Sequence, residues 1–158
     1  MSSKAIFFDR DDTLIHDSNY MYKIEQLNFI DGVFKTLKEL QDRNYLLFIV
    51  TNQSGIGRGY FEEKDMHNFN NHMLGKLLEQ GIKITDIAFC PHAPEDNCEC
   101  RKPSPKMLND LCKKYDIDKS QSYMVGDKNS DIKSGEKAGL KTFKVLGEKS
   151  IREILNQL

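Results

Sequence analysis

The chain has 158 residues, a net charge of −1 and nearly equal numbers of basic and acidic side chains, 23 against 24. That length suits one domain with a full core, so we expect a single domain over residues 1–158. A general nucleic-acid binder would show a basic excess. No apolar run is long enough to cross a bilayer, and the N-terminus lacks a secretion-signal pattern. We expect a soluble, cytoplasmic monomer that binds neither nucleic acid nor membrane.

Strand-like and helix-like segments alternate along the chain. The strand-like runs are continuously apolar, which is typical of parallel strands covered on both faces. This alternation predicts an α/β fold built on a doubly wound parallel sheet. Strands are expected at residues 4–9, 46–50, 84–90 and 122–126, with a weaker fifth at 141–146. Helices are expected at residues 33–42, 62–80, 105–115 and 129–138, with a terminal helix starting at Ser150.

The first predicted strand ends at two carboxylates, Asp9 and Asp11, spaced two residues apart. Two like charges at the end of a buried strand are typical of a site that holds a cation or a shared proton. Asp9 leaves the strand first, and a carboxylate there can attack phosphorus to form an aspartyl-phosphate. Asp11 could protonate the leaving alkoxide and then deprotonate water. Taken alone, the pair could equally be a turn or a helix start.

Three further polar segments are expected near the carboxyl ends of the strands, where open α/β sheets bind their ligands. Thr51 offers a hydroxyl to a phosphoryl oxygen, and the backbone amides of residues 52–55 offer further donors. Lys102 supplies positive charge for a transition state. Asp127 adds an oxygen ligand suited to Mg²⁺. Together with Asp9 and Asp11, these residues predict phosphoryl-transfer chemistry.

Three of the four cysteines cluster with a histidine within eleven residues. Cys90 with His92 and Cys98 with Cys100 make two pairs that can close a tetrahedral Zn²⁺ site with no open position, which indicates a structural role. Without a secretion signal, the clustering favours a metal over disulfides, and unliganded surface cysteines are the alternative. Because residues 101–102 follow the last ligand directly, the loop is expected to hold their cations against the substrate.

Four segments resemble, in order and across essentially the whole chain, the motifs of the haloacid-dehalogenase (HAD) superfamily of phosphatases. They are Asp9-Arg10-Asp11-Asp12-Thr13, Thr51-Asn52-Gln53, Arg101-Lys102-Pro103 and Gly126-Asp127. The resemblance implies that Asp9 is the nucleophile, Asp11 the general acid and base, and Thr51 and Lys102 the phosphoryl stabilisers. The implied Mg²⁺ ligands are Asp9, Asp127 and the backbone carbonyl of Asp11. Asp12 stands where the family usually has Gly, and Asp tolerates left-handed backbone better than most residues.

The cysteine loop resembles that of the zinc-containing HAD phosphatases that act on histidinol phosphate or on D-glycero-D-manno-heptose 1,7-bisphosphate. Its short spacer is similar to the histidinol-phosphate enzymes, whereas residues 29–33, 51–59 and 123–128 are similar to the heptose enzymes of lipopolysaccharide precursor biosynthesis. More segments match the latter, so the expected activity is Mg²⁺-dependent removal of the 7-phosphate. Alternatives are histidinol phosphate hydrolysis, a phosphotransferase, a phospho-acceptor signalling domain and a zinc-stapled binding module.

The resemblance also implies a set of substrate contacts. Arg58 is a candidate partner for a second phosphate, and Ser18 and Asn19 differ from the pattern of the family. The spacings leave no room for a cap domain, so residues 17–29 and the cysteine loop would shape an open crevice for a small or terminal phosphate ester. The implied contacts are Asp17, Ser18, Asn19, Tyr20, Asn52, Gln53, Ser54, Arg101 and Lys128.

Overall fold

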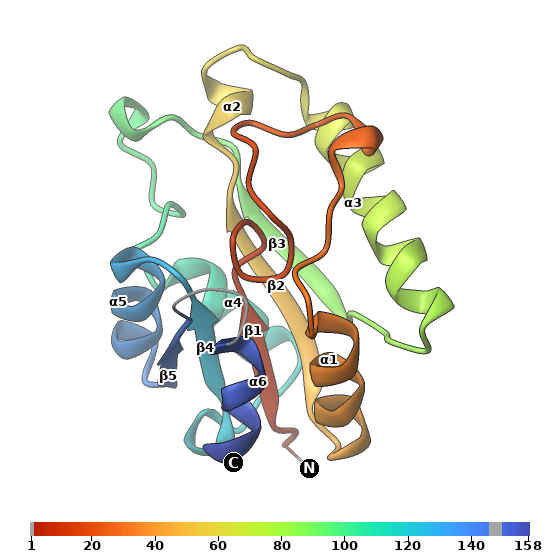
Figure 1. Ribbon diagram of the computed structural model, residues 1–158. Helices are drawn as coiled ribbons and strands as arrows, with labels where there is room; N and C mark the ends of the chain where they lie inside the picture. Colours follow the sequence, from red (N-terminus) through yellow and green to blue (C-terminus); the bar gives the residue numbers. More distant parts are fainter. Residues whose placement is uncertain (1, 146–149) are drawn as a thin grey trace.

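A computed structural model describes residues 2–145 and 150–158, which fold around a five-stranded sheet (Figure 1). The strand order is β3-β2-β1-β4-β5, and every pairing among these strands is parallel. The chain order reverses on either side of β1, which places the ligand crevice of an open α/β sheet at the carboxyl ends of the strands. The strands are β1 (Ala5–Phe8), β2 (Leu46–Asn52), β3 (Asp86–Cys90), β4 (Tyr123–Gly126) and β5 (Lys141–Lys144).

The predicted helices form with bounds shifted by no more than a residue or so. Residue 146, the end of the predicted fifth strand, lies outside the described residues. Among the described residues, none of the helices combines the length and apolarity needed to cross a membrane. The helices are α1 (Val33–Asp42), α2 (Ser54–Gly57), α3 (Glu63–Glu79), α4 (Lys106–Lys114), α5 (Asn129–Ala138) and α6 (Ser150–Glu153). Short 3₁₀ turns are η1 (Ile24–Gln26), η2 (Pro94–Asp96), η3 (Lys119–Gln121) and η4 (Ile154–Asn156).

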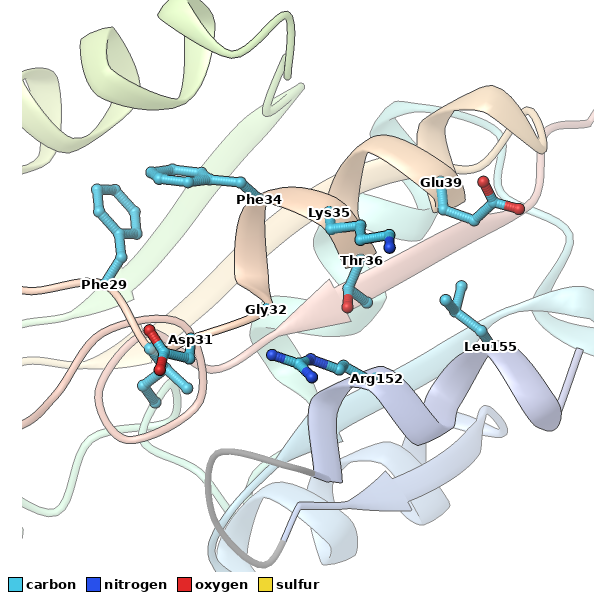
Figure 2. Close-up of a pocket in the computed structure, with 10 residues that line it drawn as sticks. Phe29, Asp31, Gly32, Phe34, Lys35, Thr36, Glu39, Arg152 and Leu155 are labelled. Atoms are coloured by element: carbon cyan, nitrogen blue, oxygen red, sulfur yellow. The ribbon is translucent and has the colours of Figure 1, made fainter.

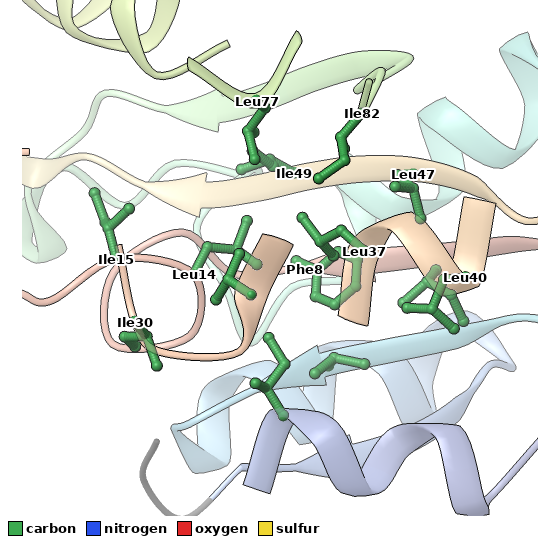
Figure 3. Close-up of a cluster of buried hydrophobic side chains, with 14 of the residues drawn as sticks. Phe8, Leu14, Ile15, Ile30, Leu37, Leu40, Leu47, Ile49, Leu77 and Ile82 are labelled. Carbon is green, nitrogen blue, oxygen red and sulfur yellow. The ribbon is translucent and has the colours of Figure 1, made fainter. Parts of the chain in front are cut away.

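Side chains of β1 alternate between two separate cores, one on each face of the sheet. Ile6 and Phe8 pack with residues of α1, α3 and α6, whereas Ala5 and Phe7 pack with residues of α4 and α5. Figure 3 shows the first core, where Phe8 lies beside Leu37 of α1. Because both faces are covered, every strand residue can be apolar, which explains the unbroken runs. The predicted doubly wound sheet is confirmed.

The segment after β1 folds back over the carboxyl end of the sheet. Residues 14–16 pair with residues 28–30, through the amide of Ile30 to the carbonyl of Leu14 at 3.0 Å and through an isolated bridge between Ile15 and Phe29. Asp12 adopts a left-handed backbone with φ of 59°, which Asp tolerates better than most residues, and its Oδ1 accepts a 3.0 Å hydrogen bond from the amide of Asp17. The loop predicted to contact substrate is therefore tied to the acidic motif.

Candidate active site

A buried lysine lies at the centre of the strand ends. Lys102 is 4% exposed, and its Nζ donates to Asp9 Oδ1 at 2.9 Å, to Asp131 Oδ1 at 2.5 Å and to the carbonyl of Val50 at 3.0 Å. Burial alone would lower the pKa of Lys102, but the charges of Asp9 and Asp131 outweigh it, so the pKa lies above its usual value. Lys102 is thus a fixed cation beside the predicted nucleophile.

Asn52, at the end of β2, holds the backbone of Lys102 from both sides. Its Oδ1 accepts from the Lys102 amide at 3.0 Å, and its Nδ2 donates to the Lys102 carbonyl at 3.4 Å. Neighbouring Thr51 is 1% exposed, and its hydroxyl accepts a 2.8 Å hydrogen bond from Gln53 Nε2. Both contacts lock the turn after β2 before any substrate arrives, which is the preorganisation that phosphoryl stabilisation requires.

Three carboxylates gather around this lysine. Oxygens of Asp9, Asp127 and Asp131 all lie within 4.8 Å of one another. Burial, followed by the nearby charge of Asp9, raises the pKa of Asp127 to about 7. Burial also raises the pKa of Asp9, although Lys102 opposes that rise. Because one lysine cannot neutralise three carboxylates, the cluster favours a bound cation.

An unpaired carboxylate oxygen shows that this cluster of three acids is suited to Mg²⁺. Asp127 Oδ1 is buried and has no hydrogen-bond partner in the structure, and a buried polar atom without a partner normally costs free energy. Carboxylate oxygens with room for water and a phosphate oxygen are the ligands that Mg²⁺ prefers. Asp9 and Asp127, both predicted ligands, are brought together here. The predicted role of the Asp11 backbone carbonyl stays a prediction.

Sequence reasoning missed Asp131 as a member of this site. Asp131 lies in the first turn of α5, and its Oδ2 accepts a 3.1 Å hydrogen bond from the amide of Lys128. A Cβ at Gly126 would lie only 2.3 Å from Asp131 Oδ2, so the glycine is what admits this carboxylate. The available signal was a second acid four residues after Asp127 on a helix that starts at the strand end.

Asp11 lies apart from the three clustered acids. Its carboxylate accepts a 2.8 Å hydrogen bond from Nε of Arg10, and its side chain is 23% exposed, facing the adjoining cavities. A carboxylate that borders the cavity without joining the cation site is suited to moving protons to and from a bound ester. Asp11 is therefore outside the group of carboxylates that includes Asp9, and its role in proton transfer stays a prediction.

A cavity of about 500 Å³ opens above the acids, and a narrower one of about 40 Å³ continues down to Asp9. Every predicted substrate residue except Ser18, which is exposed, lines the larger cavity. Thr51 is buried and is not part of the lining of this cavity. The larger cavity is lined by Asp11, Asp17, Asn19, Tyr20, Asn52, Gln53, Ser54, Gly55, Arg58, Arg101, Lys102, Pro103, Lys128 and Ser130.

The walls of the 500 Å³ cavity carry positive charge suited to an anionic ligand. Arg58, Arg101 and Lys128 join Lys102 in its lining. One terminal nitrogen of Arg101 is buried and has no hydrogen-bond partner. A buried guanidinium nitrogen with no acceptor favours a phosphate oxygen as the missing partner.

A cavity of about 680 Å³ lies elsewhere, between α1 and the C-terminal segment (Figure 2). Figure 2 shows Arg152 of α6 extending toward Gly32, with Phe29 and Phe34 on the opposite wall. Its described lining includes none of the clustered acids, so it is separate from the catalytic residues. The lining is Phe29, Ile30, Asp31, Gly32, Phe34, Lys35, Thr36, Glu39, Arg152 and Leu155.

The predicted zinc ligands do come together. Cys90 Sγ lies 3.5 Å from both His92 Nδ1 and Cys98 Sγ, and His92 Nδ1 lies 3.3 Å from Cys100 Sγ. Tetrahedral Zn²⁺ with its usual bond lengths separates such atoms by about 3.3–3.8 Å. The structure joins Cys90 and Cys100 as a disulfide, a pairing that the sequence reading disfavoured. The clustering of the four side chains is thus established, whereas a bound zinc is not.

This cysteine loop is attached to the turn that follows β2. The amide of Gln53 donates to the carbonyl of Cys90, and the amide of Gly57 donates to the carbonyl of Pro91, both at 2.8 Å. A Cβ at Gly57 would lie 2.6 Å from the amide nitrogen of Ala93, so the close approach depends on the glycine. The loop therefore connects the turn that holds Lys102 to the segment that carries Lys102.

Comparison with known proteins places this site in a family. A model of the haloacid dehalogenase-like hydrolases matches residues 8–145. The chain belongs to that family. This confirms the resemblance to the haloacid-dehalogenase superfamily that was drawn from the four motifs.

Similar members of the family include two named enzymes. The D-glycero-beta-D-manno-heptose-1,7-bisphosphate 7-phosphatase of Haemophilus ducreyi is 45% identical over 175 residues, covering 100% of this chain and 96% of the relative. The D-glycero-alpha-D-manno-heptose-1,7-bisphosphate 7-phosphatase of Campylobacter jejuni is 41% identical, covering 99% and 96%. The crystal structure of D,D-heptose 1,7-bisphosphate phosphatase from B. bronchiseptica, complexed with magnesium and phosphate, has a TM-score of 0.86 at 31% identity, covering 98% of this chain and 87% of that one.

Proposed function

We propose that this hydrolase is a Mg²⁺-dependent phosphoric monoester hydrolase that removes the 7-phosphate from D-glycero-D-manno-heptose 1,7-bisphosphate. The observation that carries the proposal is the basic cavity of about 500 Å³, which shares Lys102 and Lys128 with the narrower cavity lined by Asp9, with Lys102 fixed beside the Asp9 carboxylate. The named relatives act on this bisphosphate and align over nearly the whole chain. A sugar with a phosphate at each end also suits a cavity with cations both at its base and on its rim.

The reaction proceeds in two steps, the formation and the hydrolysis of an aspartyl-phosphate. An oxygen of Asp9 bonds to phosphorus as the bond to the sugar oxygen breaks, and Asp11 gives that oxygen a proton. A water then attacks the aspartyl-phosphate, Asp11 takes its proton, and the bond from Asp9 to phosphorus breaks to release phosphate. Lys102 and Arg101 stabilise the charge that builds on the phosphoryl oxygens. Mg²⁺, held by Asp9 and Asp127, with Asp131 bordering it, would supply further neutralisation of that charge.

The rim of the cavity is where the second phosphate would bind. Arg58 is exposed there, and its Nε donates to Ser54 Oγ at 3.3 Å. The guanidinium carbon of Arg58 lies over the Tyr20 ring, 6.0 Å from its centroid. A substrate held by its remote phosphate can direct that binding energy to orienting the reacting one.

The substrate panel that tests this function measures phosphate release with Mg²⁺ from both anomers of the heptose bisphosphate, from histidinol phosphate and from simple sugar phosphates. We expect the highest kcat/KM for one anomer of the bisphosphate; the relatives act on different anomers, so both are assayed. An added alcohol acceptor detects phosphoryl transfer instead of hydrolysis. Equal rates on all esters would defeat the substrate assignment, and absence of free phosphate would defeat the hydrolase.

We also propose that the Cys90, His92, Cys98 and Cys100 cluster binds a structural Zn²⁺. The donor set and its spacing support this, as does the position of the cluster between the turn after β2 and Lys102. A closed four-ligand site would fix the position of Cys100. Lys102 lies only two residues after Cys100, so its backbone would be held in place as well. The zinc would act on catalysis by positioning, without contact with the ester.

Cys98→Ser separates zinc from the disulfide, because only a zinc site uses Cys98. We expect the reduced chain to hold one zinc per molecule, and the variant to lose zinc, thermal stability and about tenfold or more in activity. Metal analysis, thermal unfolding and phosphate release measure these. Cys112→Ala is the matched control, since Cys112 is buried in the α4 core outside the cluster. A Cys98→Ser variant with unchanged stability and activity would favour the disulfide.

A further inference from the structure

Among the residues that the structure describes, Arg10 is the largest fully buried side chain, with 0% of its surface exposed. Its Nε donates to Asp11 Oδ1 at 2.8 Å, and a terminal nitrogen approaches Asp11 Oδ2 at 3.4 Å. The other terminal nitrogen donates to Asn70 Oδ1 at 2.9 Å. Its guanidinium carbon lies 4.8 Å from the centroid of the Phe69 ring. The guanidinium therefore contacts a carboxylate, an amide oxygen and an aromatic ring.

Burying a charged guanidinium costs free energy of folding unless hydrogen-bond partners with good geometry compensate its charge. Asp11 is the carboxylate that Arg10 contacts, and it is the group that the proposed reaction needs for proton transfer. Asn70, itself 4% exposed, and Phe69 come from α3, sixty residues away in sequence. The guanidinium of Arg10 thus links the Asp11 carboxylate to the α3 helix. The position of the carboxylate therefore does not depend only on the loop in which Asp11 lies.

We propose that Arg10 is the positioning residue for Asp11, holding its carboxylate in the orientation from which it exchanges a proton with the leaving oxygen and then with water. The inference rests on the proposed phosphatase function. An Asp side chain at a strand end has several staggered rotamers, and the planar fork of Arg selects one of them. A misplacement of about 1 Å in a reacting group can cost on the order of a hundredfold in rate.

Leaving-group dependence provides a test that a general loss of structure would not reproduce. In Arg10→Met, which keeps the buried stem, kcat for the sugar phosphate should fall about a hundredfold with little change in KM. Formation of aspartyl-phosphate from p-nitrophenyl phosphate should fall far less, because p-nitrophenolate leaves without a proton. Its hydrolysis still needs Asp11, so rapid mixing should reveal a burst of one p-nitrophenol per site.

A double-mutant cycle strengthens the test. If Arg10 acts through Asp11, Arg10→Met should add little further loss in an Asp11→Asn background. Arg10→Lys should recover part of the rate, since it keeps the charge but not the fork. Asn70→Ala releases the far end of the guanidinium and should show the same pattern more weakly. It carries the test if Arg10→Met does not fold. Arg43→Met, which removes an exposed pair with Glu39 on α1, is the control.

The outcomes separate the inference from the function on which it rests. Equal losses on both substrates without a burst, or additive losses in the cycle, would overturn the role of Arg10 while leaving the phosphatase intact. A wild-type chain that releases no phosphate from any ester would instead refute the proposed function. Thermal unfolding and binding of inorganic phosphate establish that each variant is folded.

Discussion

Asp9→Asn should reduce phosphate release by a factor on the order of 10⁴ or more, since losing a nucleophile costs most of the catalysis that depends on it. An amide cannot attack phosphorus, whereas its carbonyl oxygen can still accept the hydrogen bond from Lys102 that Asp9 accepts at 2.9 Å. The variant should remain folded and bind substrate. Single-turnover assays and trapping of phosphoenzyme in the wild type, absent in the variant, measure this.

The stability of Asp9→Asn should equal or exceed that of the wild type. Asp9 is one of three carboxylates within 4.8 Å, and its pKa is raised by burial, so removing its charge relieves repulsion. Asp110→Asn is the matched control, because Asp110 forms an exposed pair with Lys106 on α4. Turnover above about 1% of wild type in Asp9→Asn would place the nucleophile elsewhere.

The architecture was predictable because its physical cause is visible in the residues. β1 and β2 are buried on both faces, so their sequences are unbroken apolar runs, and α1 shows its buried residues at helical spacing. The sequence pattern of β5 was weaker because this strand is only partly buried at the edge of the sheet and has an exposed Lys at each end. The two-sided packing follows from general rules for α/β chains, whereas the strand order β3-β2-β1-β4-β5 was not predicted.

The part of the site that was predictable consists of charged residues at or near the carboxyl ends of the strands. Asp9, Lys102 and Asp127 meet as expected because each follows, or is tied to, the carboxyl end of a strand. Asp131 was missed because its access depends on the missing Cβ of Gly126, a contact that spacing alone does not reveal.

Two further features depend on tertiary contacts that the sequence does not display. Arg10 is charged and lies between two acidic residues in sequence, yet it is fully buried and packs against Phe69 and Asn70 of α3. The cysteine spacing predicted the cluster but not the Cys90–Cys100 pairing, since several pairings are compatible with the same short loop. Spacing in the sequence indicates which residues lie near one another. Which of those residues pair depends on the directions of their side chains in the folded chain.

Lys102→Met should destabilise the metal-free fold by about 3–5 kcal/mol, the usual cost of leaving a buried partner charge uncompensated. The lysine side chain is 3% exposed and is the cation between Asp9 and Asp131. Met fills a similar volume, so the loss reports charge and hydrogen bonds rather than a cavity. Lys106→Met is the matched control, because its exposed pair with Asp110 should contribute less than about 1 kcal/mol.

The loss in Lys102→Met should grow as pH rises. Burial raises the pKa of Asp9, and Lys102 is the charge that opposes this rise, so the variant raises that pKa further. A carboxyl group whose folded pKa exceeds its unfolded value of about 3.9 favours folding at lower pH and loses that stabilisation as pH rises through the folded pKa. Urea unfolding without Mg²⁺ should therefore show a smaller loss near pH 4 than near pH 8. An equal loss at both values would mean that Lys102 stabilises the fold by packing, and not by neutralising the acids that it joins.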